Sequence, residues 1–221
     1  MVKLRITKEA QLEQNLIELL CEGHGQWTYR PDLKSEADLW RNLRDKIENR
    51  NKSELDGHDL TDSEFERIKS EILASTKTPF DAAKWLRGEK GKCSIVLERD
   101  NGLGRIELVV YSSLEKNGGF SSYEIVNQIA KGRSKLEERE RRFDVTLLIS
   151  GLPIIQIELK TAIAKDGVKQ AYYQIEKYVD EGTFSNTIFQ TLQLFVMSNE
   201  QTTRYMAAAP KGELQENFMF S

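Results

Sequence analysis

A segment of largely alternating apolar residues that carries two carboxylates and a lysine constrains this chain more than any other. It is RRFDVTLLISGLPIIQIELK, residues 141–160. Its period of two predicts a β-hairpin with strands at 143–149 and 154–160. Ser150-Gly151-Leu152-Pro153 supplies residues typical of a turn between them. The chain must therefore accommodate an apolar hairpin that has charged side chains at the end away from its turn.

Those charged residues are Asp144, Glu158 and Lys160. Because successive side chains of a strand point to opposite faces, Glu158 and Lys160 share a face, and the hairpin brings Asp144 back beside them. Charges this close to apolar strands are costly unless they are paired or bind a metal. The residues alone leave two interpretations open, a carboxylate–lysine salt bridge at the end of a sheet and a metal site.

The metal interpretation has a definite chemistry. Mg²⁺ typically takes one or two carboxylates together with substrate phosphate. Such a metal polarises a phosphoryl oxygen and lowers the pKa of a water nucleophile, and a lysine beside it can stabilise developing negative charge or orient the water. The D…ExK pattern is short and has many chance matches, so it does not by itself exclude the salt bridge.

A helix is predicted at 168–180, directly after the hairpin. Ala171, Ile175 and Tyr178 fall on one side at helical spacing, and Gly182 is a plausible stop. Gln174 and Tyr178 are four residues apart and therefore share a face. The neighbouring tyrosines at 172 and 173 are interpreted as residues that pack against a sheet rather than as platforms for stacked bases.

With this helix in place, the chain resembles the nuclease domain of the restriction (HsdR, R) subunit of type I restriction-modification enzymes, within the PD-(D/E)xK nuclease superfamily. The resemblance is densest over about 124–205, where the following elements recur in order: Arg142-Phe143-Asp144, Gly151-Leu152-Pro153, Ile157-Glu158-Leu159-Lys160, Gln174-Ile175-Glu176-Lys177-Tyr178 and Arg204-Tyr205. One position departs from the pattern, because Phe143 stands where the family has proline. We expect a local backbone change there rather than a loss of activity.

The resemblance implies a role for each matching residue. Asp144 and Glu158 are expected to bind Mg²⁺, for which Mn²⁺ is a possible substitute, and Lys160 to assist the attacking water or the transition state. Gln174 and Tyr178 are expected to support the site or to contact the DNA backbone.

A glutamate on the first helix often completes such nuclease sites. Glu13 is the best candidate and Glu9 the second. The alternative is that Glu13 is an ordinary solvated glutamate on a helix.

The same resemblance implies a Mg²⁺-dependent endonuclease that hydrolyses phosphodiester bonds of double-stranded DNA. Its cleavage would be coupled to ATP-driven translocation by motor domains absent from this chain, and its partners would be the methyltransferase and specificity subunits. Two alternatives remain. The chain could be a stand-alone PD-(D/E)xK nuclease of repair or methyl-directed restriction, or a docking or DNA-binding module that keeps the fold without activity.

Composition excludes several other classes. No apolar run of the 221 residues is long enough for a membrane span, and no signal peptide is recognisable, so a cytoplasmic location is expected. Two cysteines and two histidines without ligand spacing make zinc improbable. The sequence contains no glycine-rich phosphate loop, so no ATP site is expected in this chain. The net charge of −3 argues against tight autonomous DNA binding. The basic stretch 131–142 could contact phosphates or be a solvated surface.

The order of elements predicts an α+β fold with a mixed β-sheet flanked by helices, a restriction-endonuclease-like core. Helices are expected at 7–22, 35–49, 61–73 and 79–86, and strands at 94–98, 105–111, 123–130, 192–198 and 203–208, besides the hairpin and helix described above. We predict a helical N-terminal region at 1–90 packed on the core, a nuclease core at 91–209, and a C-terminal linker or chain end at 210–221.

Overall fold

The computed structural model describes residues 7–22, 27–113, 121–130, 142–162, 164 and 166–221. In chain order its helices and strands are α1 Lys8–Glu22, β1 Thr28–Tyr29, α2 Glu36–Arg50, α3 Lys52–Leu55, α4 Asp62–Ser75, α5 Pro79–Arg87, β2 Lys92–Glu98, β3 Arg105–Ser112, β4 Tyr123–Ala130, β5 Arg142–Ile149, β6 Leu152–Leu159, α6 Gly167–Asp180, β7 Leu194–Ser198 and β8 Thr203–Ala207. Short 3₁₀ helices lie at Asp100–Gly102, Ile188–Thr191 and Glu216–Phe218.

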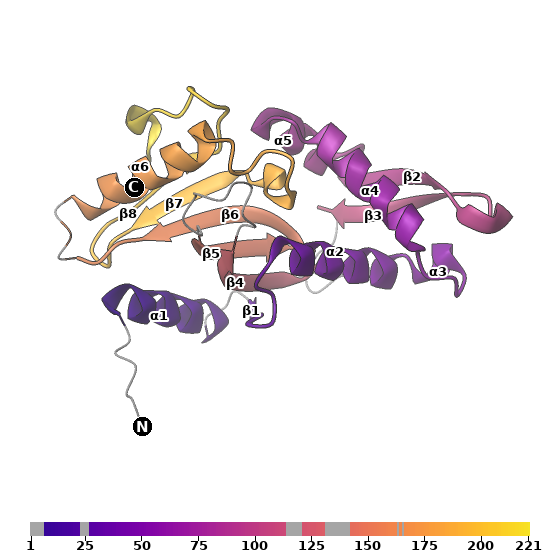
Figure 1. Ribbon diagram of the computed structural model, residues 1–221, viewed down its shortest axis with the longest axis horizontal. Helices are drawn as coiled ribbons and strands as arrows, with labels where there is room; N and C mark the ends of the chain where they lie inside the picture. Colours follow the sequence, from indigo (N-terminus) through magenta and orange to yellow (C-terminus); the bar gives the residue numbers. More distant parts are fainter. Residues whose placement is uncertain (1–6, 23–26, 114–120, 131–141, 163, 165) are drawn as a thin grey trace, which may run out of the picture.

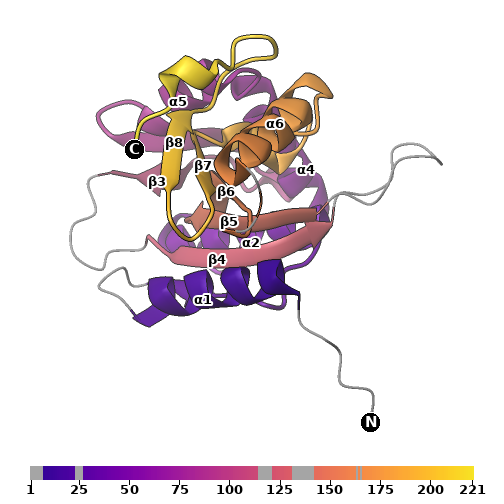
Figure 2. The same ribbon diagram turned by 90° about the vertical axis from the view of Figure 1, so that its left-hand side faces the viewer.

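A mixed sheet of six described strands organises the molecule, in the order β1-β4-β5-β6-β7-β8. The pairs β1–β4 and β6–β7 are parallel, whereas β4–β5, β5–β6 and β7–β8 are antiparallel. Helix α6 covers one face of this sheet and α1 lies on the opposite side (Figures 1 and 2). The predicted α+β class with a mixed sheet flanked by helices is confirmed.

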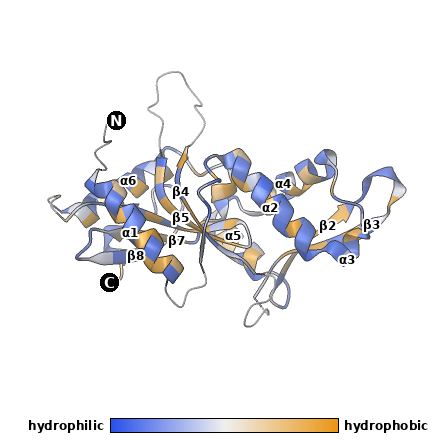
Figure 3. Cartoon of the chain, turned by 90° about the horizontal axis from the view of Figure 1, so that it is seen from below, coloured by the Kyte–Doolittle hydropathy of each residue, from blue (hydrophilic) through white to orange (hydrophobic). Residues whose placement is uncertain are grey.

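Each face of the sheet has its own apolar contacts. On the α1 side, Ile17 packs with residues of the three central strands: Ile125, Val145, Leu147, Ile157 and Leu159. On the α6 side, a larger cluster runs from α6 and β7 through the sheet into α2 and α4. Figure 3 shows these apolar positions in orange along the strands, with hydrophilic blue prominent on α2 and α4. The two clusters make the sheet a buried layer, which is why its internal polar residues need partners.

Strands β2 and β3 form a separate two-stranded sheet. This hairpin contacts α4, α5 and α2 (Figure 1), so it lies among the helices of the N-terminal region rather than beside β8 or β1. The division of the chain at residue 90 stays a prediction. The β2–β3 hairpin follows that boundary in the sequence but packs on helices that precede it.

The turn of the long hairpin is shorter than the sequence predicts. Ser150 and Gly151 alone form it, with φ of 52° and 84°, whereas Leu152 and Pro153 belong to β6. Two successive positive φ angles match the twist of antiparallel strands. Pro153 fits inside a strand because the register of β5 and β6 shifts between Leu147 and Leu148, where the regular hydrogen-bond ladder is interrupted.

Local signals place most helix boundaries correctly. The capping box of Thr61 and Glu64 is confirmed, and Ser35 forms a second one with Asp38. The polar connection predicted after Arg50 contains the short helix α3. Strand β7 begins at Leu194 rather than at 192, because residues 188–191 close a 3₁₀ turn before it.

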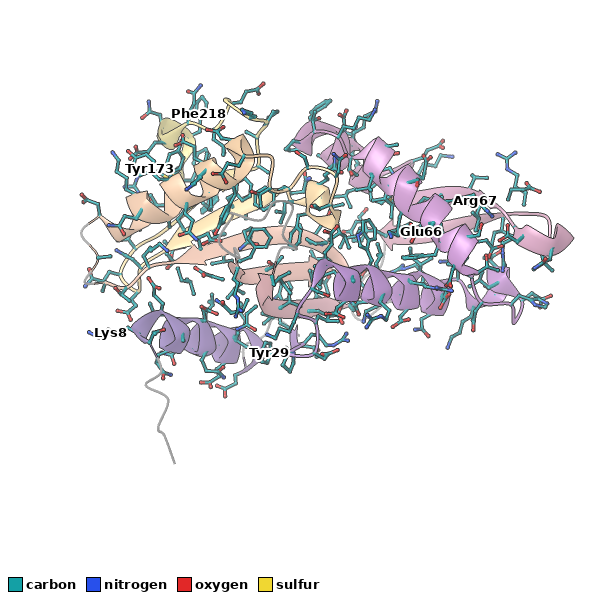
Figure 4. The ribbon with its side chains drawn as sticks, viewed as in Figure 1. Lys8, Tyr29, Glu66, Arg67, Tyr173 and Phe218 are labelled. Atoms are coloured by element: carbon teal, nitrogen blue, oxygen red, sulfur yellow. The ribbon has the colours of Figure 1, made fainter. Side chains whose placement is uncertain are left out.

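Residues 210–221 lie along α6 and β8. Tyr205 and Phe220 exchange two backbone hydrogen bonds of 2.9 Å, and the hydroxyl of Tyr172 donates to the Leu214 carbonyl. Tyr173 of α6 and Phe218 lie on the same outer side of the molecule (Figure 4). The interpretation of this segment as a linker remains a prediction, although its contacts are those of a packed segment. Among the described residues, no helix is long and apolar enough to cross a membrane.

Candidate functional site

A row of polar residues crosses the three central strands at the end away from the β5–β6 turn. Strand β4 pairs Asn127 with Val145 and Ile129 with Phe143, so Gln128 lies opposite Asp144. Strand β5 pairs Val145 with Ile157, and extending that register by one residue places Asp144 opposite Glu158. The hairpin therefore brings together the two carboxylates that the sequence separates by 14 residues.

Both carboxylates are held by hydrogen bonds. The backbone N–H of Leu159 donates to Asp144 Oδ2 at 2.8 Å. Glu158 is fully buried, and its two oxygens accept from Gln156 Nε2 at 3.2 Å and from Gln174 Nε2 at 2.7 Å. Buried polar groups with such partners are satisfied, but the negative charge itself has no equivalent compensation.

The pKa of each carboxyl group reflects this shortage of positive charge. Burial raises the pKa of Glu158 well above its usual value, and the charge of Asp144 raises it further, against the opposing effect of Lys160. Burial also raises the pKa of Asp144, while the Leu159 N–H and the charge of Lys160 lower it. The arrangement therefore favours either a proton on the pair or a nearby cation.

Lys160 reaches this pair from just beyond the strand. Strand β6 ends at Leu159 rather than at 160, and the Lys160 N–H donates to the Ser198 carbonyl of β7 at 2.9 Å. The Lys160 backbone thus continues the pairing of β6 with β7 one residue past the end of the strand. The charge of Lys160 acts on both carboxylates.

Helix α6 supplies the amide that holds Glu158. Gln174 Nε2 lies 2.7 Å from Glu158 Oε2 and 2.7 Å from the Tyr178 hydroxyl. Tyr178 is buried, and its ring meets that of Phe143 edge-on, with centroids 5.3 Å apart. Of the two roles predicted for Gln174 and Tyr178, this geometry favours support of the site, because the buried Tyr178 offers little surface to DNA.

Phe143 is a core residue at the position where the resembling family has proline. Its side chain is 1% exposed and packs against the rings of Tyr178, Phe184 and Phe189. The departure from the family pattern is thus accommodated by aromatic packing beneath Asp144.

Glu13 lies near the same row, reached from α1. It is only 6% exposed and accepts from Gln128 Nε2 at 2.7 Å and from Asn127 Nδ2 at 3.3 Å. The alternative of a solvated helix glutamate is therefore wrong. Burial raises the pKa of Glu13, and the charge of Asp144 adds to that rise. The exposed Glu9 raises the pKa of both Glu13 and Asp144 from one turn earlier on α1.

The amides that hold these carboxylates were not predicted from the sequence. Asn127, Gln128 and Gln156 are polar residues inside apolar strands, and that interruption of the pattern is the signal that could have marked them. Arg204 and Tyr205, by contrast, lie on β8, where the Tyr205 ring stacks on Phe220. Of the basic stretch 131–142, only Arg142 lies within the described residues.

The donor set partly meets the needs of a metal. No group of three or more His, Cys, Asp or Glu side chains gathers in a metal-binding arrangement in the described part of the chain. Asp144 and Glu158 nevertheless form a buried pair of hard oxygen donors, which is what Mg²⁺ uses when waters and substrate phosphate complete its shell.

Comparison with known proteins identifies the family. Residues 6–213 match the family described as the type I restriction enzyme R protein N terminus. The chain belongs to this family. The match spans every described strand of the six-stranded sheet and the acidic row described above.

Individual relatives agree with the R-protein match. The chain is 31% identical over 214 residues to the type I restriction enzyme SsaAORF53P endonuclease subunit of Staphylococcus saprophyticus, covering 96% of this chain and 20% of that protein. It is 30% identical to the SauMSSORF170P endonuclease subunit of Staphylococcus aureus over 86% of this chain and 18% of the relative. For the EcoprrI endonuclease subunit of Escherichia coli, identity is 29% over 90% of this chain and 67% of the relative. The chain therefore spans about a fifth of the length of the staphylococcal relatives.

Proposed function

We propose that this chain is the Mg²⁺-dependent endonuclease region of a type I restriction enzyme and hydrolyses phosphodiester bonds of double-stranded DNA. The observation that carries the proposal is the buried Asp144–Glu158 pair with Lys160 beside it. The names of the relatives, which are endonuclease subunits of type I restriction enzymes, support the same activity. Mn²⁺ is expected to substitute for Mg²⁺.

Each residue of the site has a definite part in this proposal. Asp144 and Glu158 would hold the metal, which when bound supplies Lewis-acid polarisation of the phosphate and a more acidic water. Lys160 would orient that water or stabilise the charge that develops on the phosphate. Gln174 fixes the rotamer of Glu158 through its 2.7 Å hydrogen bond. Glu13, whose pKa the charge of Asp144 helps to raise, would be a further oxygen donor.

Positive charge flanks the acidic row and could receive the DNA backbone. Lys34 Nζ donates to Asn127 near the end of β4. Burial lowers the pKa of Lys34, and the nearby charge of Arg142 lowers it further. Local cations of this kind would contact phosphates despite the net negative charge of the chain. Cleavage would be coupled to ATP-driven motor domains outside these residues, and the partners would be methyltransferase and specificity subunits.

The decisive experiment compares three variants in the complete enzyme. Glu158→Gln and Lys160→Ala are expected to abolish DNA cleavage while ATP hydrolysis persists, because they remove a metal ligand and the charge beside it but leave the motor intact. Loss should exceed about 100-fold in cleavage rate. Lys177→Ala is the matched control, since Lys177 is an exposed lysine of α6 outside the acidic row.

Two results would contradict the proposal. Full cleavage by Glu158→Gln and Lys160→Ala would remove the site assignment. A wild-type enzyme that binds DNA and its partner subunits but cuts nothing, with or without these substitutions, would favour a docking module instead. Thermal unfolding of each variant separates a lost reaction from a lost fold.

A further inference from the structure

Gln128 has an unusual backbone for a strand residue. Its φ is +54°, and it is the one non-glycine residue with a positive φ inside the described strands. This region is sparsely populated by side chains other than Asn, Asp and Gly. Left-handed residues of this kind are found at functional sites more often than elsewhere, because the surrounding structure must hold them there.

The consequence is a change in the direction of the side chain. Along β4, Ile125 packs on the α1 side and Val126 on the α6 side. Regular alternation would put Asn127 toward α1 and Gln128 toward α6. Instead both amides reach the same carboxylate, since Asn127 Nδ2 and Gln128 Nε2 donate to the two oxygens of Glu13 at 3.3 and 2.7 Å.

Asn127 is itself oriented by two donors. Its Oδ1 accepts from the Tyr29 hydroxyl at 2.9 Å and from Lys34 Nζ at 2.7 Å. With Oδ1 occupied on that side, the Nδ2 group is directed to Glu13. Glu13 lies inside α1 rather than at either end, so its hydrogen bonds with Asn127 and Gln128 join the sheet to the body of the helix. Figure 4 labels Lys8 at the start of α1 and Tyr29 near the C-terminal end of α1.

We propose that Gln128 is a positioning residue that uses its left-handed backbone to hold the Glu13 carboxylate of α1 beside Asp144. This inference rests on the proposed nuclease function. In this proposal, the positive φ of Gln128 brings Glu13 into the acidic site, although β4 contributes no carboxylate of its own to the row.

Gln128→Gly tests the proposal, because glycine keeps the positive φ and removes only the amide. Cleavage in the complete enzyme should fall on the order of tenfold, the effect of losing a hydrogen bond to a charged group. Mn²⁺ affinity of this chain, measured by calorimetry with a short duplex present, should weaken by a similar factor. The thermal midpoint should change little, because the gain from placing glycine at a positive φ offsets the lost hydrogen bond to Glu13.

A double-mutant cycle decides whether Gln128 acts through Glu13. Glu13→Gln should lower cleavage, and adding Gln128→Gly to it should have no further effect, because the carboxylate to be positioned is gone. Asn101→Gly is the matched control. Asn101 has the same kind of backbone, with φ of 57°, in the exposed loop between β2 and β3, and its substitution should leave cleavage and Mn²⁺ affinity unchanged.

Additive effects of the two substitutions, or wild-type cleavage and Mn²⁺ affinity in Gln128→Gly, would overturn the proposal. Either result leaves the nuclease function standing as long as Glu158→Gln still abolishes cleavage. If Glu158→Gln retains cleavage, the proposed function fails first, and the cycle then reports on the Gln128–Glu13 pair only through Mn²⁺ affinity.

Discussion

Glu158 shows what a single residue demands of its surroundings in this fold. It is a fully buried carboxylate in the middle of a sheet, and its two hydrogen-bonded amides come from β6 itself and from α6. These amides satisfy its oxygens, but burial and Asp144 still raise its pKa. The chain therefore bears an electrostatic cost at this point, which a bound cation would relieve.

That cost predicts a specific dependence of stability on pH. Because the folded pKa of Glu158 is raised, the folded state keeps a proton that the unfolded chain releases near a pKa of about 4.3. The contribution of Glu158 to stability is thus favourable below that pKa and is lost as pH rises toward the folded pKa. Glu158→Gln, which does not titrate, should therefore lose less stability than the wild type as the pH rises above about 4.3 in metal-free buffer.

Thermal unfolding over this range measures the difference between the two proteins. Added Mg²⁺ should offset the loss in the wild type and have a smaller effect in the variant. Glu66→Gln is a suitable control, because Glu66 is an exposed residue of α4 and pairs with Lys69 at the surface. Parallel stability curves for wild type and Glu158→Gln would show that Glu158 is not a strained carboxylate.

Individual elements depend on a few side chains that join them. Asn51 at the C-terminal end of α2 is one, with its side chain 2% exposed. Its Nδ2 donates to the Val109 carbonyl at 2.9 Å and its Oδ1 accepts from the Val109 N–H at 2.8 Å. The Asn51 amide thus takes the place of a neighbouring strand along β3, and it fixes the β2–β3 hairpin to the helix.

Asn51→Ala should therefore destabilise the protein by about 2 to 4 kcal/mol, because two partly buried backbone groups of Val109 lose their partner. Urea unfolding gives the free energy. Asn49→Ala on the same helix is the control, since Asn49 is exposed and bonds only within α2, and its effect should stay within about 0.5 kcal/mol. Equal, small effects of both substitutions would mean that water replaces the Asn51 amide.

The molecule as a whole is joined by its larger apolar cluster. This cluster contains Ile72 of α4 and Leu108 of β3 together with Ile175 of α6 and Phe195 of β7. The buried Glu124 of β4 adds a polar link, since it pairs with Arg30 and with Lys46 of α2. Continuous burial of this kind couples the helical half to the six-stranded sheet.

We therefore expect one cooperative unfolding transition for both halves. Leu108→Ala in β3 should cost about 2 to 5 kcal/mol and lower hydrogen-exchange protection in β5 and β6 as much as in β2 and β3. Val96→Ala is the control, because Val96 of β2 is 53% exposed. If Leu108→Ala reduced protection only in β2 and β3, the two halves would be independent units.

The sequence by itself determined the features that depend on neighbours along the chain. The period of two predicted the hairpin, the capping box of Thr61 and Glu64 predicted the start of α4, and the hairpin brought Asp144 to Glu158. These features follow from local sterics and hydrogen bonding, which the order of residues specifies directly. The family pattern added Gln174 and Tyr178, which α6 does place against the site.

Only the tertiary structure decided which distant residues surround those carboxylates. Glu13 and Gln128 are separated by 115 positions in the chain, and no periodicity relates them. Their contact depends on how α1 packs on the sheet and on the positive φ of Gln128, which no local signal indicates. Phe143 departs from the family motif in the sequence, and only the structure shows that its ring packs against Tyr178 in the core. The pairing of buried polar groups is set by the packing of elements distant in sequence, because each such group must find a partner wherever the fold supplies one.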